Sequence, residues 1–408
     1  MLHPLPRRGN QLTPLIMWGL KIELYMTHTG RTLDRRTVLT MTGAGALGAL
    51  AGCVGGSDEG DDDPVDGGDG DEAGADGPLT DYQYTSPPQI VDVAEQDFQS
   101  TLRTVPARHQ LVTDEGMGGP LELPEVWAWK ADDRDPSVPG PIFRMPEGET
   151  LELTYDNTEH NRPHTVHVHA VGKTWKDDGA PVATRERVDP GEKHTYELHG
   201  DVPGTHVYHC HYQTHNHLDM GMYGIFRVDP EGYEPADREY FFTLREWDTD
   251  LHEREAGGDA EYDPADRSSN AYTLNGRSAP TTFHPELGTP LIVSEGETVR
   301  LHVSNNGYES HPFHTHAHRF RVVEKDGSPV PEAAQYEEDV VNIGPAERYT
   351  LEFEADADPG IYPAHCHKVH HVTNEGVYPG GMATAIVYES AMDTDEFAEV
   401  MDDAGFEG

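Results

Sequence analysis

Residues 207–212 read V-Y-H-C-H-Y, a run in which one cysteine stands between two histidines. If this run is a β-strand, alternate side chains point to opposite faces of the sheet. His209 and His211 then share one face, and Cys210 points to the other. One short segment would therefore supply side chains to two separate sites.

The same arrangement occurs a second time in the chain. Residues 365–367 again read H-C-H, and each H-C-H is preceded by three histidines with the spacing H-x2-H-x-H, at residues 164–169 and 311–316. On a strand, the second and third of these histidines share a face, and the first faces the opposite way. The repeat predicts a duplicated chain with two domains of ordinary size.

Sorting the side chains by face gives two chemically different groups in each half. The first group has one histidine, one cysteine and a following loop that contains histidine and methionine. The loop residues are His215, His217, Met220 and Met222 in the first half, and His370, His371 and Met382 in the second. Imidazole, thiolate and thioether ligands together are typical of a blue, type 1 copper site. The second group is all imidazole and has enough histidines for a copper cluster.

Two simpler interpretations compete with copper binding. A pair of histidines one residue apart is often only part of a polar surface, and such a pair can also bind zinc. Neither interpretation explains why two cysteines each stand between two histidines, after the same three-histidine pattern. The soft set of cysteine, histidine and methionine favours copper over zinc.

Short β-like runs fill most of residues 81–392. Runs such as G-E-T-L-E-L-T-Y at residues 148–155 and E-T-V-R-L-H-V at residues 297–303 are separated by glycine, proline, asparagine and aspartate. Short strands with turn signals at this rhythm predict an all-β fold of two sandwich domains. We place the domains at residues 81–232 and 233–392, followed by an acidic tail at residues 393–408.

The repeated histidine and cysteine pattern resembles that of the multicopper oxidase family. It is most similar to the two-domain branch, the small laccases, which is related to copper nitrite reductase, and the resemblance covers roughly residues 91–389. It implies two tandem cupredoxin-like Greek-key β-sandwich domains. It also implies type 1 copper in both domains and a trinuclear cluster of type 2 and type 3 copper.

The resemblance assigns ligands residue by residue. In the first domain it implies a type 1 site of His164, Cys210, His217 and Met222, while His215 with Met220 keeps the same spacing and stays open as an alternative. In the second domain the implied ligands are His311, Cys366, His371 and Met382, the last of which follows an inserted N-E-G-V-Y-P segment. The cluster would be held by His167, His169, His209, His211, His314, His316, His365 and His367. His318 and His370 belong to neither group.

The activity that the resemblance implies is oxidation of a small reducing substrate, phenol-like or a metal ion, with reduction of dioxygen to water. Two-domain relatives build the cluster between the first domain of one subunit and the second domain of the next, which predicts a homotrimer. The alternatives are a copper-containing nitrite reductase and a non-enzymatic cupredoxin that transfers electrons or binds copper. In nitrite reductases other residues replace His167 and His211, so dioxygen is favoured. Asp177, Asp178 and Asp219 are candidates for proton delivery.

The N-terminal 80 residues resemble sorting signals and a tether. Arg35 and Arg36 precede a mild apolar run, and residues 50–53 read L-A-G-C, which resembles a lipobox. We predict a twin-arginine signal with a lipobox at residues 1–53, export, and a lipid anchor on Cys53 at the outer face of the cytoplasmic membrane. Removal of the signal near Cys53 without lipidation is the alternative. Residues 54–80 are rich in aspartate, glutamate and glycine, which predicts a disordered tether.

The charge of the chain is strongly negative, with 74 acidic against 29 basic residues and a net charge of −45. Such a surface repels phosphates, so nucleic acid is excluded as a partner. The composition resembles adaptation to high salt, where screening removes the self-repulsion. Of the three cysteines, one belongs to the signal and two are ligand candidates, so no disulfide framework is expected.

Overall fold

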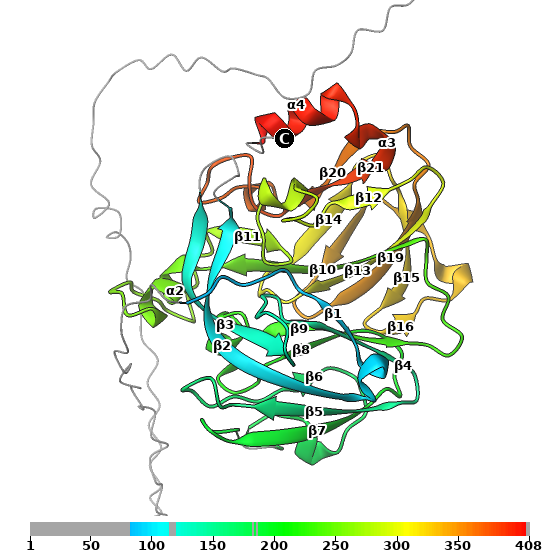
Figure 1. Ribbon diagram of the computed structural model, residues 1–408. Helices are drawn as coiled ribbons and strands as arrows, with labels where there is room; N and C mark the ends of the chain where they lie inside the picture. The colour runs from blue at the N-terminus through cyan, green and yellow to red at the C-terminus, as the bar shows by residue number, and fades with distance from the viewer. Residues whose placement is uncertain (1–81, 114–119, 182, 185–186, 405–408) are drawn as a thin grey trace, which may run out of the picture. The chain divides into compact units, whose positions relative to one another are not determined.

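β-Strands dominate the structure, which is a computed structural model (Figure 1). It describes residues 82–113, 120–181, 183–184 and 187–404. The predicted signal, the lipobox and the tether lie outside these residues, and so does the end of the acidic tail. Among the helices that the structure describes, none is long and apolar enough to cross a lipid bilayer.

The first domain is a sandwich of two sheets. The four-stranded sheet has the order β3 (Leu121–Ala131), β2 (Gln99–Val112), β5 (Thr150–Asp156) and β7 (Lys193–His199). The five-stranded sheet has the order β1 (Ile90–Asp92), β4 (Ile142–Pro146), β9 (Tyr223–Asp229), β8 (Gly204–His209) and β6 (His167–Val168). β6 runs antiparallel to β8, and the register places His167 opposite His209. Two predicted cluster ligands thus stand side by side.

The second domain repeats this plan. Its larger sheet has the order β11 (Ala271–Leu274), β10 (Arg238–Trp247), β13 (Thr298–Asn305), β19 (Arg348–Glu354), β15 (Phe320–Lys325) and β16 (Ser328–Pro329), with β17 (Glu337–Glu338) paired to β15. Its five-stranded sheet has the order β12 (Leu291–Val293), β21 (Ala383–Tyr388), β20 (Ile361–Cys366), β14 (His311–Thr315) and β18 (Val340–Ile343). β14 runs antiparallel to β20 and places His314 opposite His365. Residues 230–237 connect the two domains, whose limits stay a prediction.

Each sandwich closes over its own apolar core. In β5 every second side chain, Leu151, Leu153 and Tyr155, is buried against residues of the facing sheet. β13 contributes Val299, Leu301 and Val303 to the second core in the same way. The two cysteines of the H-C-H segments are buried members of these cores. The two sulfurs are therefore buried among apolar side chains.

Helices are short and lie between strands or, for the last two, after the final strand β21. The α-helices are α1 (Thr214–His217), α2 (Thr249–Glu255), α3 (Glu389–Met392) and α4 (Asp395–Asp403). Single 3-10 turns are η2 (Val93–Gln96), η3 (Trp175–Asp177), η4 (Thr281–Phe283), η5 (Glu332–Ala334) and η6 (Val369–His371). α1 and η6 come shortly after the two core cysteines, so they determine how the following histidines return toward the sulfur.

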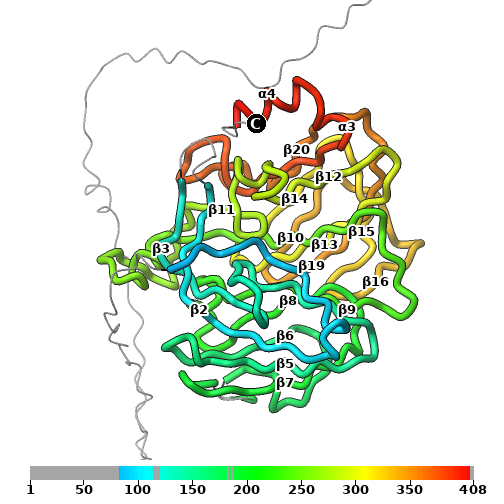
Figure 2. The backbone as a smooth tube through the Cα atoms, in the orientation of Figure 1, coloured from blue at the N-terminus to red at the C-terminus, as the bar shows by residue number. Residues whose placement is uncertain are grey.

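The hairpin of β2 and β3 connects the domains. It extends beyond the first sandwich and reaches β11 of the second (Figure 2). The N–H of Ser278 donates to the carbonyl of Leu111 over 2.8 Å, and Leu111 shares an apolar cluster with Trp247 and Ala271. The two domains are therefore held together by a small core of their own.

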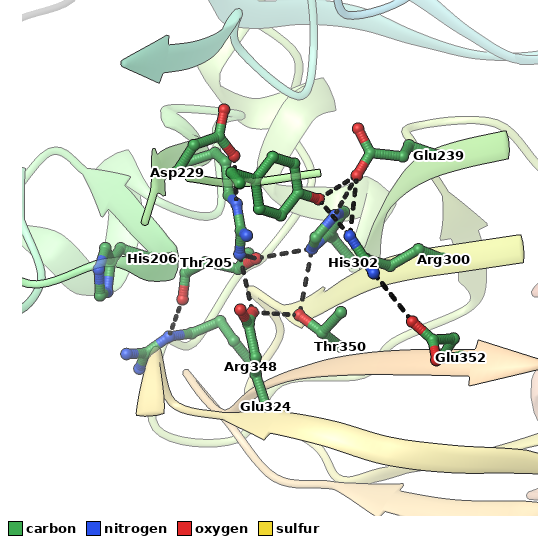
Figure 3. A network of polar contacts seen from close by, with 12 residues as sticks. Thr205, His206, Asp229, Glu239, Arg300, His302, Glu324, Arg348, Thr350 and Glu352 are labelled. Carbon is green, nitrogen blue, oxygen red and sulfur yellow. Dashed lines mark hydrogen bonds and ion pairs between the residues drawn. The ribbon is translucent and has the colours of Figure 1, made fainter. Parts of the chain in front are cut away.

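A buried polar network forms a second contact between the domains (Figure 3). Arg227 of β9 has no exposed side-chain area and donates to Glu324 of β15 over 2.7 Å and to Thr205 of β8 over 3.2 Å. His302 of β13 lies 3.0 Å from the Thr205 hydroxyl and 3.1 Å from that of Thr350. Arg227 also pairs with Asp229 over 3.0 Å, and Glu324 also accepts from the Thr350 hydroxyl over 2.6 Å. Removing either charge would break the buried ion pair between the domains, which is costly. The network fixes β8, the strand that leads to the first H-C-H segment, against the second domain.

Candidate metal centres

A buried cysteine follows the last residue of β8, with two imidazole rings against its sulfur. Sγ of Cys210 lies 3.3 Å from Nδ1 of His217 and 3.9 Å from Nδ1 of His164. The two ring nitrogens are 3.0 Å apart, and all three side chains are buried. The three atoms converge closely enough to bind one metal ion. We call these residues the Cys210 group.

Helix α1 determines which histidine of the loop joins the Cys210 group. It turns His217 inward, where the residue is 1% exposed, and leaves His215 exposed to solvent. Backbone hydrogen bonds place Met222 beside the group. The Cys210 N–H donates to the Met222 carbonyl over 3.1 Å, and the Met222 N–H donates to the His217 carbonyl over 3.2 Å. Of the two pairs that the sequence leaves open, the geometry favours His217 with Met222.

The second domain contains an equivalent Cys366 group. Sγ of Cys366 lies 3.5 Å from Nδ1 of His371 and 3.8 Å from Nδ1 of His311, and the two ring nitrogens are 3.1 Å apart. Met382 is fully buried. Its carbonyl accepts from the Cys366 N–H over 3.0 Å, and its N–H donates to the His371 carbonyl over 2.8 Å. The inserted segment therefore does not remove the methionine from the group.

The protonation of these side chains suits a soft metal ion. Burial raises the pKa of the Cys210 and Cys366 thiols to about 12, so each thiol keeps its proton until a metal replaces it. Burial lowers the pKa of His217 and His371 to about 3, so both rings are neutral and offer a lone pair. Two neutral imidazoles, one thiolate and a neighbouring thioether fit copper better than zinc or a hard cation.

A set of histidines gathers on the other face of the first H-C-H segment. The ligand atoms of His167, His169 and His209 lie within 4.8 Å of one another, and the Nε2 atoms of His169 and His209 are 3.1 Å apart. The ring of His211 packs 5.2 Å from that of His167. We call these four residues the first half-cluster. One segment thus supplies side chains to two groups, as the alternation of a strand predicts.

The second domain holds an equivalent second half-cluster. The ligand atoms of His314, His316 and His365 lie within 4.8 Å of one another, and the Nε2 atoms of His316 and His365 are 3.2 Å apart. The ring of His367 packs 5.4 Å from that of His314. Every histidine that the sequence assigned to the cluster therefore lies in one of the two half-clusters.

Hydrogen bonds to backbone carbonyls fix which nitrogen of these rings carries the proton. Nδ1 of His167 lies 2.6 Å from the Asp178 carbonyl, and Nδ1 of His209 lies 2.9 Å from the Cys210 carbonyl. The second domain repeats both contacts, at His314 with Asp339 and at His365 with Cys366. Because a carbonyl only accepts, Nδ1 must be the protonated nitrogen in each ring. Nε2 then keeps its lone pair for a metal ion.

Each half-cluster belongs to a single domain. In the part of the chain that the structure describes, no set of three converging ligand atoms combines a histidine of one domain with a histidine of the other. His211 and His367 are exposed, which leaves one side of each half-cluster open. The two half-clusters of one chain are therefore separate from each other.

Two residues that sequence reasoning missed contact the first histidine of each cysteine group. Nδ1 of His160 lies 2.8 Å from Nε2 of His164, and Oε2 of Glu246 lies 2.8 Å from Nε2 of His311. His160 stands four residues before His164, a spacing that was visible in the sequence. Glu246 lies on β10, and no pattern in the sequence around it indicates a contact with His311.

A further group lies beside the Cys366 group. Glu309, His370 and His371 bring three ligand atoms within 4.8 Å of one another. His370 is exposed, and Lys368 donates to Glu309 over 2.8 Å. The sequence alone predicts His370 to lie outside the metal sites, because nothing in its immediate neighbourhood points to Glu309.

The three carboxylates proposed for proton delivery differ in their surroundings. Oδ1 of Asp178 lies 3.4 Å from Nδ1 of His167, beside the first half-cluster. Asp177 contacts a histidine of β7 instead, over 3.1 Å. Asp219 is paired with the buried Arg245. Of the three, Asp178 is the one whose carboxylate lies within 4 Å of a half-cluster histidine.

Comparisons with known proteins agree with this geometry. Two family models, both described as multicopper oxidase, match residues 132–232 and 259–384, which together make up more than half of the 408 residues. Among solved structures, a blue copper oxidase from Nitrosomonas europaea is 29% identical, with a TM-score of 0.63 over 72% of this chain and 87% of that chain. The multicopper oxidase mgLAC is also 29% identical, with a TM-score of 0.62 over 73% of this chain and 87% of that chain.

Curated relatives include proteins named for nitrite reduction. A probable nitrite reductase-hydroxylamine oxidoreductase fusion protein of Kuenenia stuttgartiensis is 25% identical over 61% of this chain, which spans only 28% of that protein. A copper-containing nitrite reductase of Neisseria gonorrhoeae is 25% identical over 73% of this chain and 72% of that protein. The likeness to these relatives extends over both domains.

Proposed function

The chain belongs to the multicopper oxidase family and contains two cupredoxin domains, and from this premise we propose that it oxidises a small reducing substrate and passes the electrons to dioxygen. Copper would supply one-electron chemistry at the cysteine groups and the reduction of dioxygen to water at a trinuclear cluster. The observation that carries the proposal is the H-C-H segment, present twice, which serves a cysteine group and a half-cluster at once.

Different residues of the chain would hold the two kinds of copper site. The Cys210 group with Met222, and the Cys366 group with Met382, would hold type 1 copper, and the two half-clusters would hold type 2 and type 3 copper. A cysteine and the histidine before it are adjacent in the chain, so a short covalent path joins the sites. Asp178 can supply protons beside the first half-cluster, because its carboxylate lies 3.4 Å from His167.

We propose that the cluster forms between subunits of a homotrimer. Each half-cluster of one chain is separate from the other and has an exposed histidine, His211 or His367. Joining the first half-cluster of one subunit to the second half-cluster of the next would complete three clusters in a closed ring. Oligomerisation would then be required for dioxygen reduction.

Nitrite reduction is the second candidate function, because copper-containing nitrite reductases match both domains. One observation favours dioxygen. His167 and His211 both lie in the first half-cluster, with rings 5.2 Å apart. A nitrite reductase is expected to have other residues at these two positions. A simple electron carrier, the third candidate, would need a cysteine group but no half-clusters.

For the reducing substrate we propose a metal cation. Glu309 and His370 form a group with His371 of the Cys366 group, so a cation held there would lie next to a proposed copper ligand. The net charge of −45 attracts cations to the surface in general. Lys368 is bonded to Glu309 and must move aside for the cation to bind. Removing this lysine by Lys368→Ala should therefore lower the KM for ferrous ion and leave the KM for a phenol unchanged.

We also propose export by the twin-arginine route and a lipid anchor on Cys53, on the basis of Arg35, Arg36 and the L-A-G-C segment. Mass spectrometry of the membrane fraction should find a lipid-modified N-terminal cysteine. A mature N-terminus beyond Cys53 would support simple secretion instead.

One set of measurements on the copper-loaded protein tests the proposed activity. Ferrous ion or a phenol is supplied under air, and the consumption of dioxygen and of nitrite is followed in parallel, together with the copper content. About five copper ions per chain and uptake of dioxygen would support the proposal. Nitrite consumption without dioxygen uptake would replace it with nitrite reduction, and the absence of both would leave an electron carrier.

A further inference from the structure

The two cysteine groups differ in what holds their first histidine. Nε2 of His311 lies 2.8 Å from Oε2 of Glu246, and neither residue has exposed side-chain area. Nε2 of His164 lies 2.8 Å from Nδ1 of His160 instead. In both groups the other ring nitrogen, Nδ1, faces the cysteine. The first histidine of the Cys366 group therefore contacts a carboxyl group, and the first histidine of the Cys210 group contacts an imidazole.

Glu246 is surrounded by hydrogen-bond donors. Its Oε1 accepts from the backbone N–H of Tyr308 and, over 2.8 Å, from that of Glu309. Its Oε2 faces Nε2 of His311, which must carry a proton when Nδ1 binds a metal. A protonated carboxyl group would have to donate one hydrogen bond, and the contacts of Glu246 offer no acceptor. Glu246 is therefore a buried carboxylate with a full negative charge.

His160 is a neutral partner in the same role. Its Nδ1 faces Nε2 of His164 and also accepts from the Arg162 N–H over 3.3 Å. A nitrogen that accepts carries no proton, so the ring is uncharged unless its other nitrogen gains one. An imidazole carries no negative charge in either protonation state. No negative charge adjoins the Cys210 group at this position.

The difference is built into equivalent positions of the two domains. Asn157 and Asn305 mark the same place, because the side-chain amide of each donates to two backbone carbonyls. Asn305 pairs with Leu244 of β10, two residues before Glu246. Extending the pairing of β5 with β2 by two residues places Asn157 opposite residue 104, two residues before Pro106, so Pro106 of β2 occupies the position that Glu246 has in β10. A side chain at Gly307 would clash with Glu246, since its Cβ would lie 1.9 Å from Oε2. The second domain is thus shaped around this carboxylate, and the first has no carboxylate at the matching position.

We propose that Glu246 is a positioning residue that makes the two type 1 sites unequal, by giving copper in the Cys366 group a lower reduction potential than copper in the Cys210 group. The inference rests on the proposed copper sites. A carboxylate bonded to the outer nitrogen of a metal-bound imidazole makes the ring a stronger electron donor. A buried negative charge close to the metal also favours the ion with the higher positive charge, here cupric over cuprous.

The inequality has a consequence for the substrates of the enzyme. The Cys366 group would accept electrons only from stronger reductants and would pass them on readily. The Cys210 group would accept electrons from weaker reductants as well. The two domains of one chain would therefore accept electrons from reductants of two different ranges of reduction potential.

Two single-site variants of the full chain test the proposal without touching Glu246. Cys210→Ser leaves only the Cys366 group able to form blue copper, and Cys366→Ser leaves only the Cys210 group. Each copper-loaded variant is titrated with redox mediators, and the blue absorption band reports its reduction potential. The potential is expected to be lower in Cys210→Ser than in Cys366→Ser. Equal potentials, or the reverse order, would overturn the proposal.

Glu246→Gln, made in the Cys210→Ser chain, tests the role of the carboxylate directly. Glutamine keeps the size of the side chain but removes its charge, so the potential should rise and the affinity for cupric ion should fall about 10- to 100-fold relative to that for cuprous ion. His160→Gln in the Cys366→Ser chain is the matched control, because it exchanges one neutral partner for another and should shift the potential less.

The outcomes separate this inference from the proposed function. An intact blue band with an unchanged potential in Glu246→Gln would overturn the role of Glu246 and leave the copper sites standing. If Glu246→Gln fails to fold, the comparison of the two single-site variants still decides the order of potentials. The absence of a blue band from the unaltered protein would overturn the proposed function, and this inference with it.

Discussion

Nδ1 of His209 lies 2.9 Å from the carbonyl oxygen of Cys210, so the residue whose sulfur belongs to one group also orients a ring of the other group. His365 and Cys366 show the same relationship at 3.0 Å. The contact uses only the backbone of the cysteine. The orientation of the half-cluster and the chemistry of the sulfur are therefore separable by mutation.

The double variant Cys210→Ser, Cys366→Ser should lose the blue band and keep the cluster. Serine preserves the backbone carbonyls that orient His209 and His365, but its hydroxyl is a poor ligand for copper at a type 1 site. The copper content should fall from about five to about three ions per chain. Dioxygen uptake should fall by at least about 100-fold, because electrons lose their route to the cluster. Complete loss of copper would contradict this separation.

His217→Ala and His215→Ala form a matched pair on helix α1. His217 is buried with Nδ1 3.3 Å from the Cys210 sulfur, whereas His215 is exposed. In a Cys366→Ser chain, His217→Ala should abolish the blue band and His215→Ala should retain it. Visible absorption of the copper-loaded variants provides the measurement. Loss of the band in His215→Ala alone would reverse the assignment.

Part of this geometry follows from local rules that a sequence displays. Alternation along a strand separates Cys210 from His209 and His211, and the repeated spacing predicts the second set of ligands. The sandwich fold follows from the short strands and their turn signals. These features need no knowledge of distant contacts.

The remainder depends on tertiary packing. The direction of helix α1 determines that His217, and not His215, faces the cysteine. The spacing of residues in the sequence does not predict that direction. Glu246 reaches His311 from a strand 65 positions earlier in the chain, so no local pattern links them. Glu309 joins His370 in the same way.

Subunit complementation should reveal where the cluster forms. His209→Ala removes a residue of the first half-cluster, and His365→Ala removes a residue of the second, so each variant alone should have little dioxygen uptake. Co-expressed chains of the two kinds should recover part of the activity, because some interfaces of a mixed trimer pair two intact half-clusters. The same mixture with His209→Ala and His211→Ala chains is the control. A lack of recovery would indicate a cluster within one chain.

Salt should stabilise the protein until its charges are screened. A net charge of −45 opposes the folded state by self-repulsion, which salt reduces. The Tm of the copper-loaded protein should rise steeply with potassium chloride and level off near about 1 M, where the Debye length is only about 3 Å. A Tm that falls with salt, or that keeps rising linearly, would contradict screening as the cause.

Copper binding to the cysteine groups should release protons from the two thiols and none from their buried imidazoles. Burial raises the pKa of Cys210 and Cys366 to about 12, so both thiols are protonated at neutral pH, whereas it lowers the pKa of His217 and His371 to about 3, so those rings have already lost their proton. The affinity of each group for cuprous ion should therefore rise about tenfold per pH unit between about pH 6 and pH 9. Anaerobic calorimetry in two buffers of different ionisation enthalpy measures the release. The Cys210→Ser, Cys366→Ser chain gives the background from the half-clusters. A release that does not exceed this background would show that the thiols are already ionised in the metal-free protein.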